Sequence, residues 1–446
     1  MSFPAYPTYQ DSGISWIGPV PAGWSVKRLR FLAQVQTGIA KGKDVQGIET
    51  IRVPYLRVAN VQDGFIDIDD VSEIEIAATD LGRYLLRAGD VLMNEGGDFD
   101  KLGRGQVWNG AIDPCIHQNH VFAVRPHGIE PEWLALVTSA DCGRFFFMTR
   151  AKQSTNLASI SSTNLLELPV PCPPPAERRA IMRFLDREAG KIDALVAEQE
   201  RLIALLKQKR QAVISQAVTK GLDASVPMKD SGVAWLGQVP AHWEVLRLGA
   251  LFREAIEEGE HDLPVLSVSI HDGVSDRELS DSEMDRKVTR SEDRTKYKKV
   301  AVGDLVYNMM RAWQGGFGTV AVAGMVSPAY VVARPRGDLR TAFVEFVLRT
   351  PQAIEEMRRY SKGVTDFRLR LYWDEFKQIV LAVPPLTEQA SILAAIDDQA
   401  ARFDTLTTEA HRAIALLRER RAALISAAVT GKIDVRGLCL SVDEAA

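Results

Sequence analysis

The sequence of 446 residues predicts an α+β fold in which two globular α/β domains are joined by two long antiparallel coiled-coil helices, as an internal pseudo-two-fold repeat. Three duplicated features predict it: a tryptophan motif, a mixed helix-and-strand region after each motif, and a long helical segment with apolar residues every seven positions. We expect globular domains at 1–172 and 223–383, long helices at 173–222 and 384–435, and a C-terminal tail at 436–446.

The tryptophan motif is the clearest sign of the repeat. It reads Asp-Ser-Gly-Xaa-Xaa-Trp-Xaa-Gly-Xaa-Xaa-Pro-Xaa-Xaa-Trp and occupies residues 11–24 and, 219 positions later, residues 230–243. A duplicated half predicts a pseudo-two-fold molecule. Halves that bind different ligands should differ at their binding residues, so we interpret the shared tryptophans as structural. They are Trp16, Trp24, Trp235 and Trp243.

The two globular regions mix short β-branched runs with turns, which favours strands packed with helices. They share a framework in which Gly89–Asn94 resembles Gly303–Asn308, and an Arg-Pro pair returns at Arg125 and Arg334. The rest of each region differs between the halves. The pattern therefore predicts one scaffold that carries two different surfaces.

A glycine-rich polar loop follows each framework strand, at 95–106 and 309–318, and a second polar segment lies at 152–156 and 362–368. Glycine lets a backbone approach a ligand closely, and arginine, lysine and glutamine can reach phosphates and base edges. An ordinary hairpin connection is the alternative interpretation of each loop. The candidate DNA-binding residues are Asn94, Lys101, Arg104, Gln106, Lys152, Gln153, Thr155, Asn156, Lys298, Asn308, Arg311, Trp313, Gln314, Lys362, Thr365, Arg368 and Arg370.

The helical segment from Ala176 to about Lys220 has the seven-residue repeat of a two-stranded coiled coil. Its seam comprises Leu185, Ile192, Gln199, Leu206 and Val213, with Leu195 and Leu202 on a parallel track. The seam returns 211 residues later as Ile396, Phe403, Ala410, Leu417 and Leu424, with Leu406 matching Leu195. Each helix therefore has a candidate partner in the same chain.

Composition bounds the class of protein. Hydrophobic residues make up 46% and charged residues 25%, as in globular proteins, and no apolar run approaches the ~18 residues of a membrane span. The four cysteines lack CxxC spacing, which favours a reducing cytoplasm without a zinc site or disulfide framework. The net charge of −4 gives no global nucleic-acid signature, but basic clusters occur locally at 201–220, 286–299 and 357–370.

Several catalytic motifs are missing from the sequence. It has no GxxxxGK[ST] phosphate loop, no GxGxxG after a strand, and no Asn/Asp-Pro-Pro-aromatic tetrapeptide that would hold a flipped adenine. His117 and His120 lack a third metal ligand at suitable spacing, so we interpret them as core or surface histidines. We expect no catalytic residues, no metal and no cofactor bound by this chain.

The chain resembles the specificity subunit of type I restriction-modification systems. The resemblance rests on the paired tryptophan motifs, on Pro-Pro-Leu-Thr-Glu-Gln at 384–389, and on Ile-Ser-Xaa-Ala-Val-Thr at 214–219 and 425–430. It covers nearly the whole chain. The first helix start departs from the pattern, because Arg178 stands where the second half has Gln389. That departure leaves the helix start intact and affects only a local contact.

The resemblance implies a cytoplasmic, non-catalytic subunit with two target recognition domains, each of which binds one half of a bipartite double-stranded DNA sequence. Two methyltransferase subunits, which methylate adenine from S-adenosylmethionine, and ATP- and magnesium-dependent restriction subunits would be its partners. The seam from Leu185 to Val213 would be about 43 Å long, comparable to the ~34 to 36 Å between half-sites one DNA turn apart. A two-fold protein scaffold without DNA and a fused restriction or methyltransferase enzyme are the alternatives.

Overall fold

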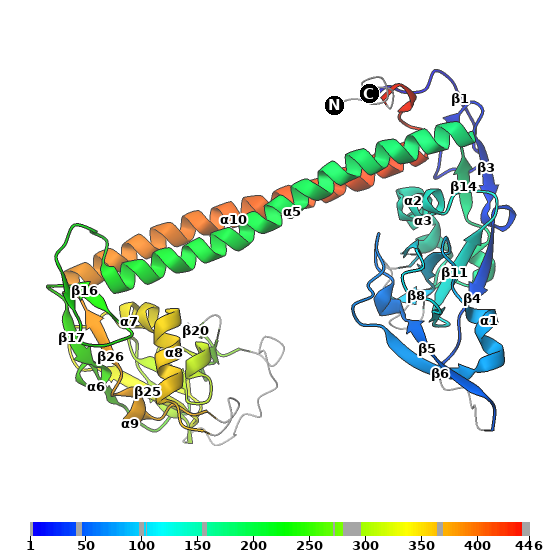
Figure 1. The fold of residues 1–446 in the computed structure, drawn as a ribbon. Coiled ribbons are helices and arrows are strands. Elements are labelled where there is room, and N and C mark those ends of the chain that lie inside the picture. Colours follow the sequence, from blue (N-terminus) through cyan, green and yellow to red (C-terminus); the bar gives the residue numbers. More distant parts are fainter. Residues whose placement is uncertain are drawn as a thin grey trace. The chain divides into compact units, whose positions relative to one another are not determined.

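The computed structural model describes residues 3–41, 47–97, 102–103, 105–153, 158–270, 273–279, 296–363 and 369–438. The chain divides into two compact units (Figure 1). Unit 1 combines residues 1–200 with 411–446, and unit 2 comprises residues 201–410. Unit 2 is therefore continuous in sequence, whereas unit 1 is assembled from both ends of the chain.

Unit 1 contains short strands and helices before the first long helix. Its strands are β1 (Tyr9–Gln10), β2 (Val20–Pro21), β3 (Ser25–Arg28), β4 (Ala33–Thr37), β5 (Thr50–Leu56), β6 (Ser72–Ala77), β7 (Val91–Asn94), β8 (Gly96–Gly97), β9 (Gly105–Val107), β10 (Ile116–His117), β11 (Val121–Pro126), β12 (Lys152–Gln153), β13 (Ala158–Ser159) and β14 (Pro169–Cys172). Its helices are η1 (Leu29–Phe31), η2 (Val58–Asn60), η3 (Ala78–Asp80), α1 (Leu81–Tyr84), α2 (Pro131–Ser139), α3 (Asp141–Arg150), α4 (Ser162–Leu165) and η8 (Arg436–Leu438).

Unit 2 contains the corresponding elements of the second half. Its strands are β15 (Met228–Asp230), β16 (Gln238–Pro240), β17 (Glu244–Arg247), β18 (Phe252–Glu254), β19 (Val268–Ser269), β20 (Gly273–Val274), β21 (Lys298–Val300), β22 (Leu305–Asn308), β23 (Phe317–Thr319), β24 (Gly324–Val326), β25 (Tyr330–Pro335) and β26 (Val380–Val383). Its helices are α6 (Leu248–Leu251), η6 (Ala312–Gln314), α7 (Thr341–Leu348), α8 (Pro351–Tyr360) and α9 (Trp373–Phe376). The long helices α5 (Pro175–Lys220) and α10 (Leu386–Val429) each contribute to both units.

The same sheet topology occurs in both halves. A four-stranded antiparallel sheet has the order β4-β11-β7-β9 in unit 1 and β18-β25-β22-β23 in unit 2. Each tryptophan motif forms a small hairpin, β1-β2 or β15-β16, and each connection to a long helix leaves through a two-stranded ladder, β3-β14 or β17-β26. The repeat predicted from sequence is therefore also a repeat of hydrogen-bonding pattern.

The framework residues shared by the two sequences form a matched ion pair in each central sheet. Arg125 Nε and Nη2 donate to the two carboxylate oxygens of Asp90, each at 2.7 Å. Arg334 contacts both oxygens of Asp304 in the same way, each at 3.0 Å. Each aspartate is buried and also accepts a hydrogen bond from the backbone nitrogen three residues earlier. This contact fixes the turn before the central strand.

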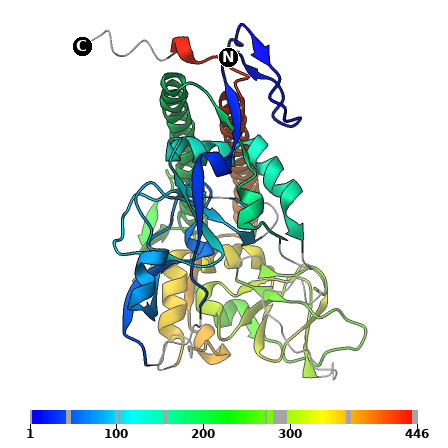
Figure 2. The ribbon, with the colours of Figure 1, turned by 90° about the vertical axis from the view of Figure 1, so that its right-hand side faces the viewer.

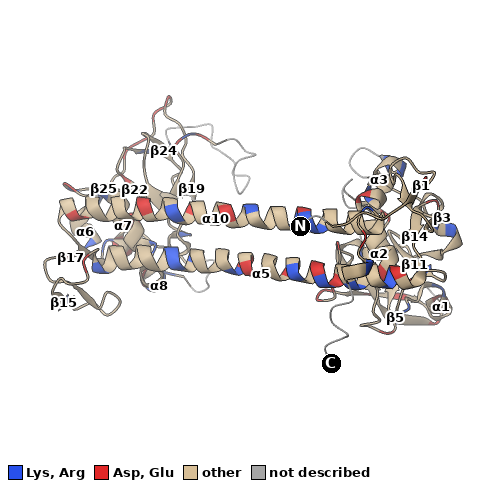
Figure 3. Ribbon diagram, turned by 90° about the horizontal axis from the view of Figure 1, so that it is seen from above, with Lys and Arg blue, Asp and Glu red and all other residues tan. Residues whose placement is uncertain are grey.

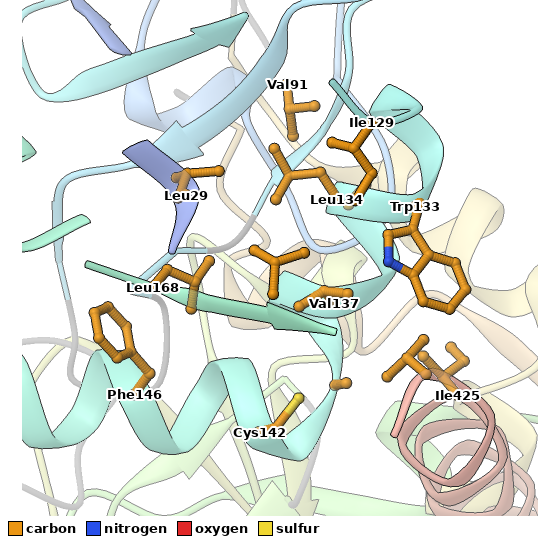
Figure 4. Close-up of a cluster of buried hydrophobic side chains, with 14 of the residues drawn as sticks. Leu29, Val91, Ile129, Trp133, Leu134, Val137, Cys142, Phe146, Leu168 and Ile425 are labelled. Atoms are coloured by element: carbon orange, nitrogen blue, oxygen red, sulfur yellow. The ribbon is translucent and has the colours of Figure 1, made fainter. Parts of the chain in front are cut away.

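The hydrophobic core of unit 1 joins its sheet to both long helices. Figure 4 shows Trp133 of α2 near Ile425, which comes from α10, whereas Leu134 of the same helix lies near Val91 and Ile129. Trp133 Nε1 donates to the carbonyl oxygen of Pro171 at 2.8 Å, so this buried indole also fixes β14 just before α5 begins. The packing therefore ties the position of α2 to the end of the last strand.

Each long helix begins at or directly after a proline, Pro175 in α5 and Pro385 before α10, and a glycine follows the end of each within two residues. Proline at the first helical position suits α5 because its missing N–H would have no partner there. Gly221 follows α5 with a φ of +79°, and Gly431 follows α10 with a φ of +70°, a left-handed conformation that glycine adopts readily. The first helix thus spans Pro175–Lys220, where the sequence predicts a helix from Ala176 to about Lys220. Figure 3 shows that both helices carry residues of both charge signs.

Within each unit the two long helices pack with opposite chain directions. In unit 1, Arg421 pairs with Asp193 at 3.0 Å and Arg418 with Glu200 at 3.1 Å. In unit 2, Arg210 pairs with Asp404 at 2.9 Å. Asp404 and Arg421 lie 211 residues after Asp193 and Arg210. The pairs Asp193–Arg421 and Arg210–Asp404 are therefore equivalent in the repeat.

The predicted second track of the seam is wrong. Leu195, Leu202 and Leu406 are 52%, 41% and 46% exposed, whereas Ile203 and Ile414 are buried. Besides the predicted seam, the buried apolar residues therefore include positions four residues after a seam residue, whereas the positions three residues after it are exposed. Heptad spacing alone does not distinguish these two registers, because leucine occupies the exposed track as well.

The tryptophan motifs hold helix starts and helix ends together. Trp24 and Trp243 are buried, and each indole nitrogen donates at 3.1 Å to a glutamate in the first turn of a long helix, Glu177 or Glu388. A Cβ atom added at Gly431 would lie 2.2 Å from Pro21 Cδ. The structural interpretation of these two tryptophans is confirmed, since their rings are not available to an external ligand.

The two end segments of the described chain pack against each other in unit 1 (Figure 2). The backbone nitrogen of Asp434 donates to the carbonyl oxygen of Pro4 at 2.7 Å, and the Arg436 guanidinium lies over the Tyr6 ring at 4.8 Å. Tyr9 also donates its hydroxyl to Gly431 O at 3.1 Å. These contacts complete the first tryptophan motif with residues from the other end of the chain.

Candidate nucleic-acid interface

The two polar segments predicted in the first half lie together in unit 1. The strand β8, in the glycine-rich loop, pairs with β13, which in turn pairs with β12 of the second segment. The backbone nitrogen of Ile160 donates to Glu95 O at 2.9 Å. Segments about 60 residues apart in sequence therefore share one three-stranded sheet.

Unit 2 brings its two polar segments together at the equivalent position. The backbone nitrogen of Leu371 donates to Met309 O at 2.9 Å. Met309 follows the framework strand as Glu95 does in unit 1. Lys362 and Arg370 form an antiparallel bridge, with both backbone hydrogen bonds at 2.9 Å. Both halves therefore use the same backbone contact to join two loops of different sequence.

Two candidate residues from the ends of the framework strands have structural contacts. Asn94 is 3% exposed, and its Nδ2 donates to Val61 O at 2.9 Å. Asn308 Oδ1 accepts from the Met310 backbone nitrogen at 2.9 Å, which shapes the turn into η6. In this conformation Asn94 has no exposed surface for DNA, so its inclusion among the DNA-contacting residues is not supported by its position.

The remaining candidates of the first half are partly described. Gln106 Nε2 donates to Gly64 O at 2.9 Å, and Lys152 is exposed on β12. The side chain of Gln153 lies outside what the structure describes, although its backbone forms part of β12. Four further candidates fall outside the described residues: Lys101, Arg104, Thr155 and Asn156.

Three candidates of the second half lie in or directly before a short helical turn. Arg311 precedes η6, which contains Trp313 and the exposed Gln314. The turn closes at Gly315, whose φ of +90° favours glycine, and a Cβ at Gly316 would lie 2.9 Å from Arg311 O. The glycines are therefore required for the turn that places Arg311 and Gln314.

Other candidates of the second half have partners within the protein. Lys298 Nζ donates to Tyr330 O at 2.7 Å, and Lys362 forms an ion pair with Glu375. These contacts make Lys298 an unsuitable phosphate ligand in this conformation. Arg370 is exposed, with Nη2 3.7 Å from the sulfur of Met310. Thr365 and Arg368 lie outside the described residues.

Sequence reasoning missed a contact between α8 and η6. The Arg358 guanidinium lies over the Trp313 ring, with Cζ 5.7 Å from the ring centroid. Arg358 belongs to a basic cluster that the sequence does reveal, but its partner is 45 positions away. The contact follows only from the tertiary structure, in which α8 packs on η6.

The histidines are held by protein groups, as expected. His117 is fully buried with Nδ1 2.7 Å from Val121 O, and burial lowers its pKa to about 4. His120 Nδ1 lies 3.2 Å from Glu95 Oε2. Across the described parts of the chain, no group of three or more His, Cys, Asp or Glu side chains could hold a metal ion.

A hollow of about 420 Å³ in unit 2 is lined by residues such as His242, Asp338 and Gln389, at the start of α10. It lies at the attachment of the domain to the helix, not at the paired loops. Among the described residues, no helix is long and apolar enough to cross a membrane.

Comparison with known proteins finds relatives over most of the length of this chain. The EcoKI specificity subunit of Escherichia coli K12 is 21% identical over 93% of this chain and 90% of its own length, and the EcoBI specificity subunit of Escherichia coli is 24% identical over 88% and 89%. Over most of its length, the chain is similar to specificity subunits of type I restriction enzymes. No family model matches it. The MjaX specificity subunit of Methanocaldococcus jannaschii is 27% identical to this chain, over 52% of the chain and only about half, 53%, of the relative.

Solved structures show the same fold. A chain from a study of complex assembly and conformational transition in a type I restriction-modification system has a TM-score of 0.62 to this chain, with 17% identity, over 93% of this chain and 99% of its own. The HsdS subunit of Thermoanaerobacter tengcongensis gives a TM-score of 0.49 at 17% identity, over 93% and 98%. The chain therefore shares its fold with the first of these two structures, although few residues are identical.

Proposed function

We propose that this chain is the DNA-binding specificity subunit of a type I restriction-modification system. Each globular domain, 1–172 and 223–383, recognises one half of a bipartite double-stranded DNA target. The two long helices pair as an antiparallel coiled coil and set the distance between the half-sites. The chain itself carries out no chemistry.

The paired loops are the observation that carries this proposal. In both units, one backbone hydrogen bond joins the residue after the framework strand to a residue that closely follows the second polar segment, Glu95 with Ile160 and Met309 with Leu371. The framework is the same, but the side chains of the loops differ. A subunit that recognises two different DNA sequences needs this combination, because backbone contacts fix position and side chains determine which bases are bound.

The proposed partners follow from the family. Two methyltransferase subunits would bind S-adenosylmethionine and methylate adenine, and restriction subunits would bind ATP and magnesium and cleave DNA. The relatives are named as subunits of such enzymes, and the solved complex concerns the assembly of one. In this assembly the present chain needs no cofactor of its own, which agrees with its lack of phosphate-loop and methyl-donor motifs.

The test is a methylome of a host that expresses this chain with its methyltransferase partner. We expect one bipartite methylated motif. Replacing residues 31–170 with the equivalent region of a relative should change one half of that motif and leave the other unchanged. A change in both halves would contradict independent domains.

Two further outcomes would contradict the proposed function and indicate a different one. Methylation or cleavage of DNA by the purified chain alone would identify an enzyme. Failure to bind DNA at low salt, with and without the methyltransferase, would identify a protein scaffold, because phosphate contacts are strongest at low ionic strength.

A further inference from the structure

The polar turn at 311–316 in the second domain leads directly into β23, an edge strand of the four-stranded sheet. The backbone groups of an edge strand point alternately toward the sheet and away from it. Val320 N bonds inward, to Asp304 O at 2.8 Å. Phe317 O and Thr319 N therefore face the open edge, where they need partners from outside the sheet.

An ion pair at the end of α7 provides both partners. Arg349 Nη2 donates to Phe317 O at 2.8 Å, and Glu345 Oε2 accepts from Thr319 N at 2.8 Å. Arg349 Nε also donates to Glu345 Oε1 at 3.0 Å, and the two side chains are only 23% and 20% exposed. One donor and one acceptor on the same helix thus take the place that a further strand would occupy.

Arg349 also lies against the end of the turn itself. A Cβ atom added at Gly315, which closes the turn, would lie 3.8 Å from Arg349 Nη1, and one added at Gly273 of β20 would lie 3.4 Å from Arg349 Nη2. The Arg349 guanidinium is 5.0 Å from the centroid of the Phe317 ring. Arg349 therefore joins the end of the turn to α7 and to the hairpin of β19 and β20.

The first domain fixes the equivalent strand edge with a different side chain. Val107 of β9 has the register position that Thr319 has in β23, so its backbone nitrogen also faces outward. That nitrogen donates to Gln106 Oε1 at 2.8 Å, and Gln106 Nε2 donates to Gly64 O at 2.9 Å. The contact at this edge therefore differs between the two domains, as the neighbouring loops do, although the sheet is the same.

We propose that Arg349, together with Glu345, is a positioning residue for DNA recognition by the second domain. It fixes the turn at 311–316 without contacting DNA itself. This inference rests on the function proposed above. Side chains that bind bases must be held within about 0.5 Å of their productive positions, whereas phosphate contacts carry no sequence information. Loss of the edge contact should therefore weaken base preference while phosphate contacts remain.

Arg336 provides a matched control at the other end of the same sheet. Its Nε donates to Phe252 O of β18 at 3.0 Å, and β18 is the opposite edge strand. Arg336→Ala and Arg349→Ala therefore remove the same charge and the same kind of contact, an arginine bonded to a backbone carbonyl of an edge strand. Only the strand that contacts Arg349 continues from the turn.

The experiment uses the full chain co-expressed with its methyltransferase partner. Methylomes are compared for wild type, Arg349→Ala, Glu345→Gln and Arg336→Ala, after an exchange of residues 223–383 has assigned the second half-site. Arg349→Ala should reduce discrimination in that half-site by roughly 3-fold to 10-fold, near the lower end of what one bidentate base contact contributes. The first half-site should not change. Arg336→Ala should leave the whole motif unchanged.

The salt dependence of DNA binding separates positioning from direct contact. For the purified complex of chain and methyltransferase, Arg349→Ala should have the same salt dependence as wild type, because no phosphate contact is lost. Glu345→Gln is the second test if Arg349→Ala does not fold. It keeps an oxygen for Thr319 N but weakens the charge-assisted bond to Arg349, so it should relax the same half-site by roughly 2-fold.

The inference is wrong if the second half-site is unchanged in the folded variants of Arg349 and Glu345, or if Arg336→Ala relaxes it as much as Arg349→Ala does. A weaker salt dependence in Arg349→Ala would also overturn it, because Arg349 would then be a phosphate ligand. In each case a bipartite wild-type motif leaves the proposed function standing. If wild type gives no bipartite motif and does not bind DNA, the function fails, and this inference fails with it.

Discussion

The indole nitrogen of Trp243 donates a hydrogen bond to Glu388 Oε1 at 3.1 Å. The contact joins the second tryptophan motif to the first turn of α10, and Trp24 makes the same contact with Glu177 at the same distance. Glu388 also bonds His242 through its other oxygen, at 2.7 Å. One carboxylate thus fixes the start of a long helix to residues that follow the hairpin at the beginning of the second domain.

Glu388→Ala should lower the free energy of unfolding by about 1 to 3 kcal/mol, because the buried Trp243 N–H would lose its acceptor. Glu388→Gln, which keeps an oxygen at this position, should lose less. Urea titration measures both, with Glu409→Ala at an exposed position of α10 as the control. Equal stabilities of the Glu388→Ala and Glu409→Ala variants would show that the contact contributes nothing.

Ile203→Ala should destabilise the protein by about 2 to 4 kcal/mol, because Ile203 is buried between the long helices. The adjacent Leu202→Ala should change stability by less than about 0.5 kcal/mol, since Leu202 is exposed in this chain. Thermal unfolding of the two variants side by side distinguishes the observed seam from the one predicted by sequence. If Leu202→Ala were the more destabilising of the two variants, the track predicted from the sequence would be the buried one.

Stability should fall as the pH is lowered from about 6.5 toward 4, in part through His117. Burial holds the His117 pKa at about 4, whereas an unfolded histidine titrates near 6.5. Protons therefore bind the unfolded chain first, and the loss attributable to this residue approaches about 3 kcal/mol at pH 4.

His117→Asn keeps a donor for Val121 O but does not titrate, so it should flatten this part of the stability profile. His261→Asn serves as the control, because the His261 side chain is 91% exposed. Unfolding midpoints in denaturant at pH 4.5 and 7 compare the variants. An unaltered pH dependence in His117→Asn would assign the effect to other groups.

Lengthening both long helices by one heptad, after Gln199 and after Ala410, should keep the seam in phase and add about 10 Å. That length equals about three base pairs, which also rotate one half-site by roughly 100° about the DNA axis. We expect a folded protein with both half-site preferences that methylates a longer-spaced motif inefficiently or not at all. Full activity on the original spacer, measured in a methylome, would show that these helices do not set the distance.

Periodicity and duplication made the repeat and the long helices predictable from sequence, because both depend on residues close together or at a constant offset. The second track was wrong because Leu195 and Leu202 satisfy the same spacing as a buried track. Asn94 seemed a ligand-facing residue, yet its amide bonds Val61, which is 33 positions away. The stacking of Arg358 on Trp313 could not be predicted, since no local pattern relates residues on different elements of the tertiary structure.

The discontinuity of unit 1 has a consequence for how the chain is made on the ribosome. Residues 201–410 contain every segment of unit 2, so unit 2 can fold while translation continues. In unit 1, Tyr9 cannot donate its hydrogen bond until Gly431 has been synthesised, and Pro4 cannot accept its hydrogen bond until Asp434 has been synthesised. The first domain to leave the ribosome is therefore the last to be completed, and during that interval it presents apolar surface that Ile425 and its neighbours later cover.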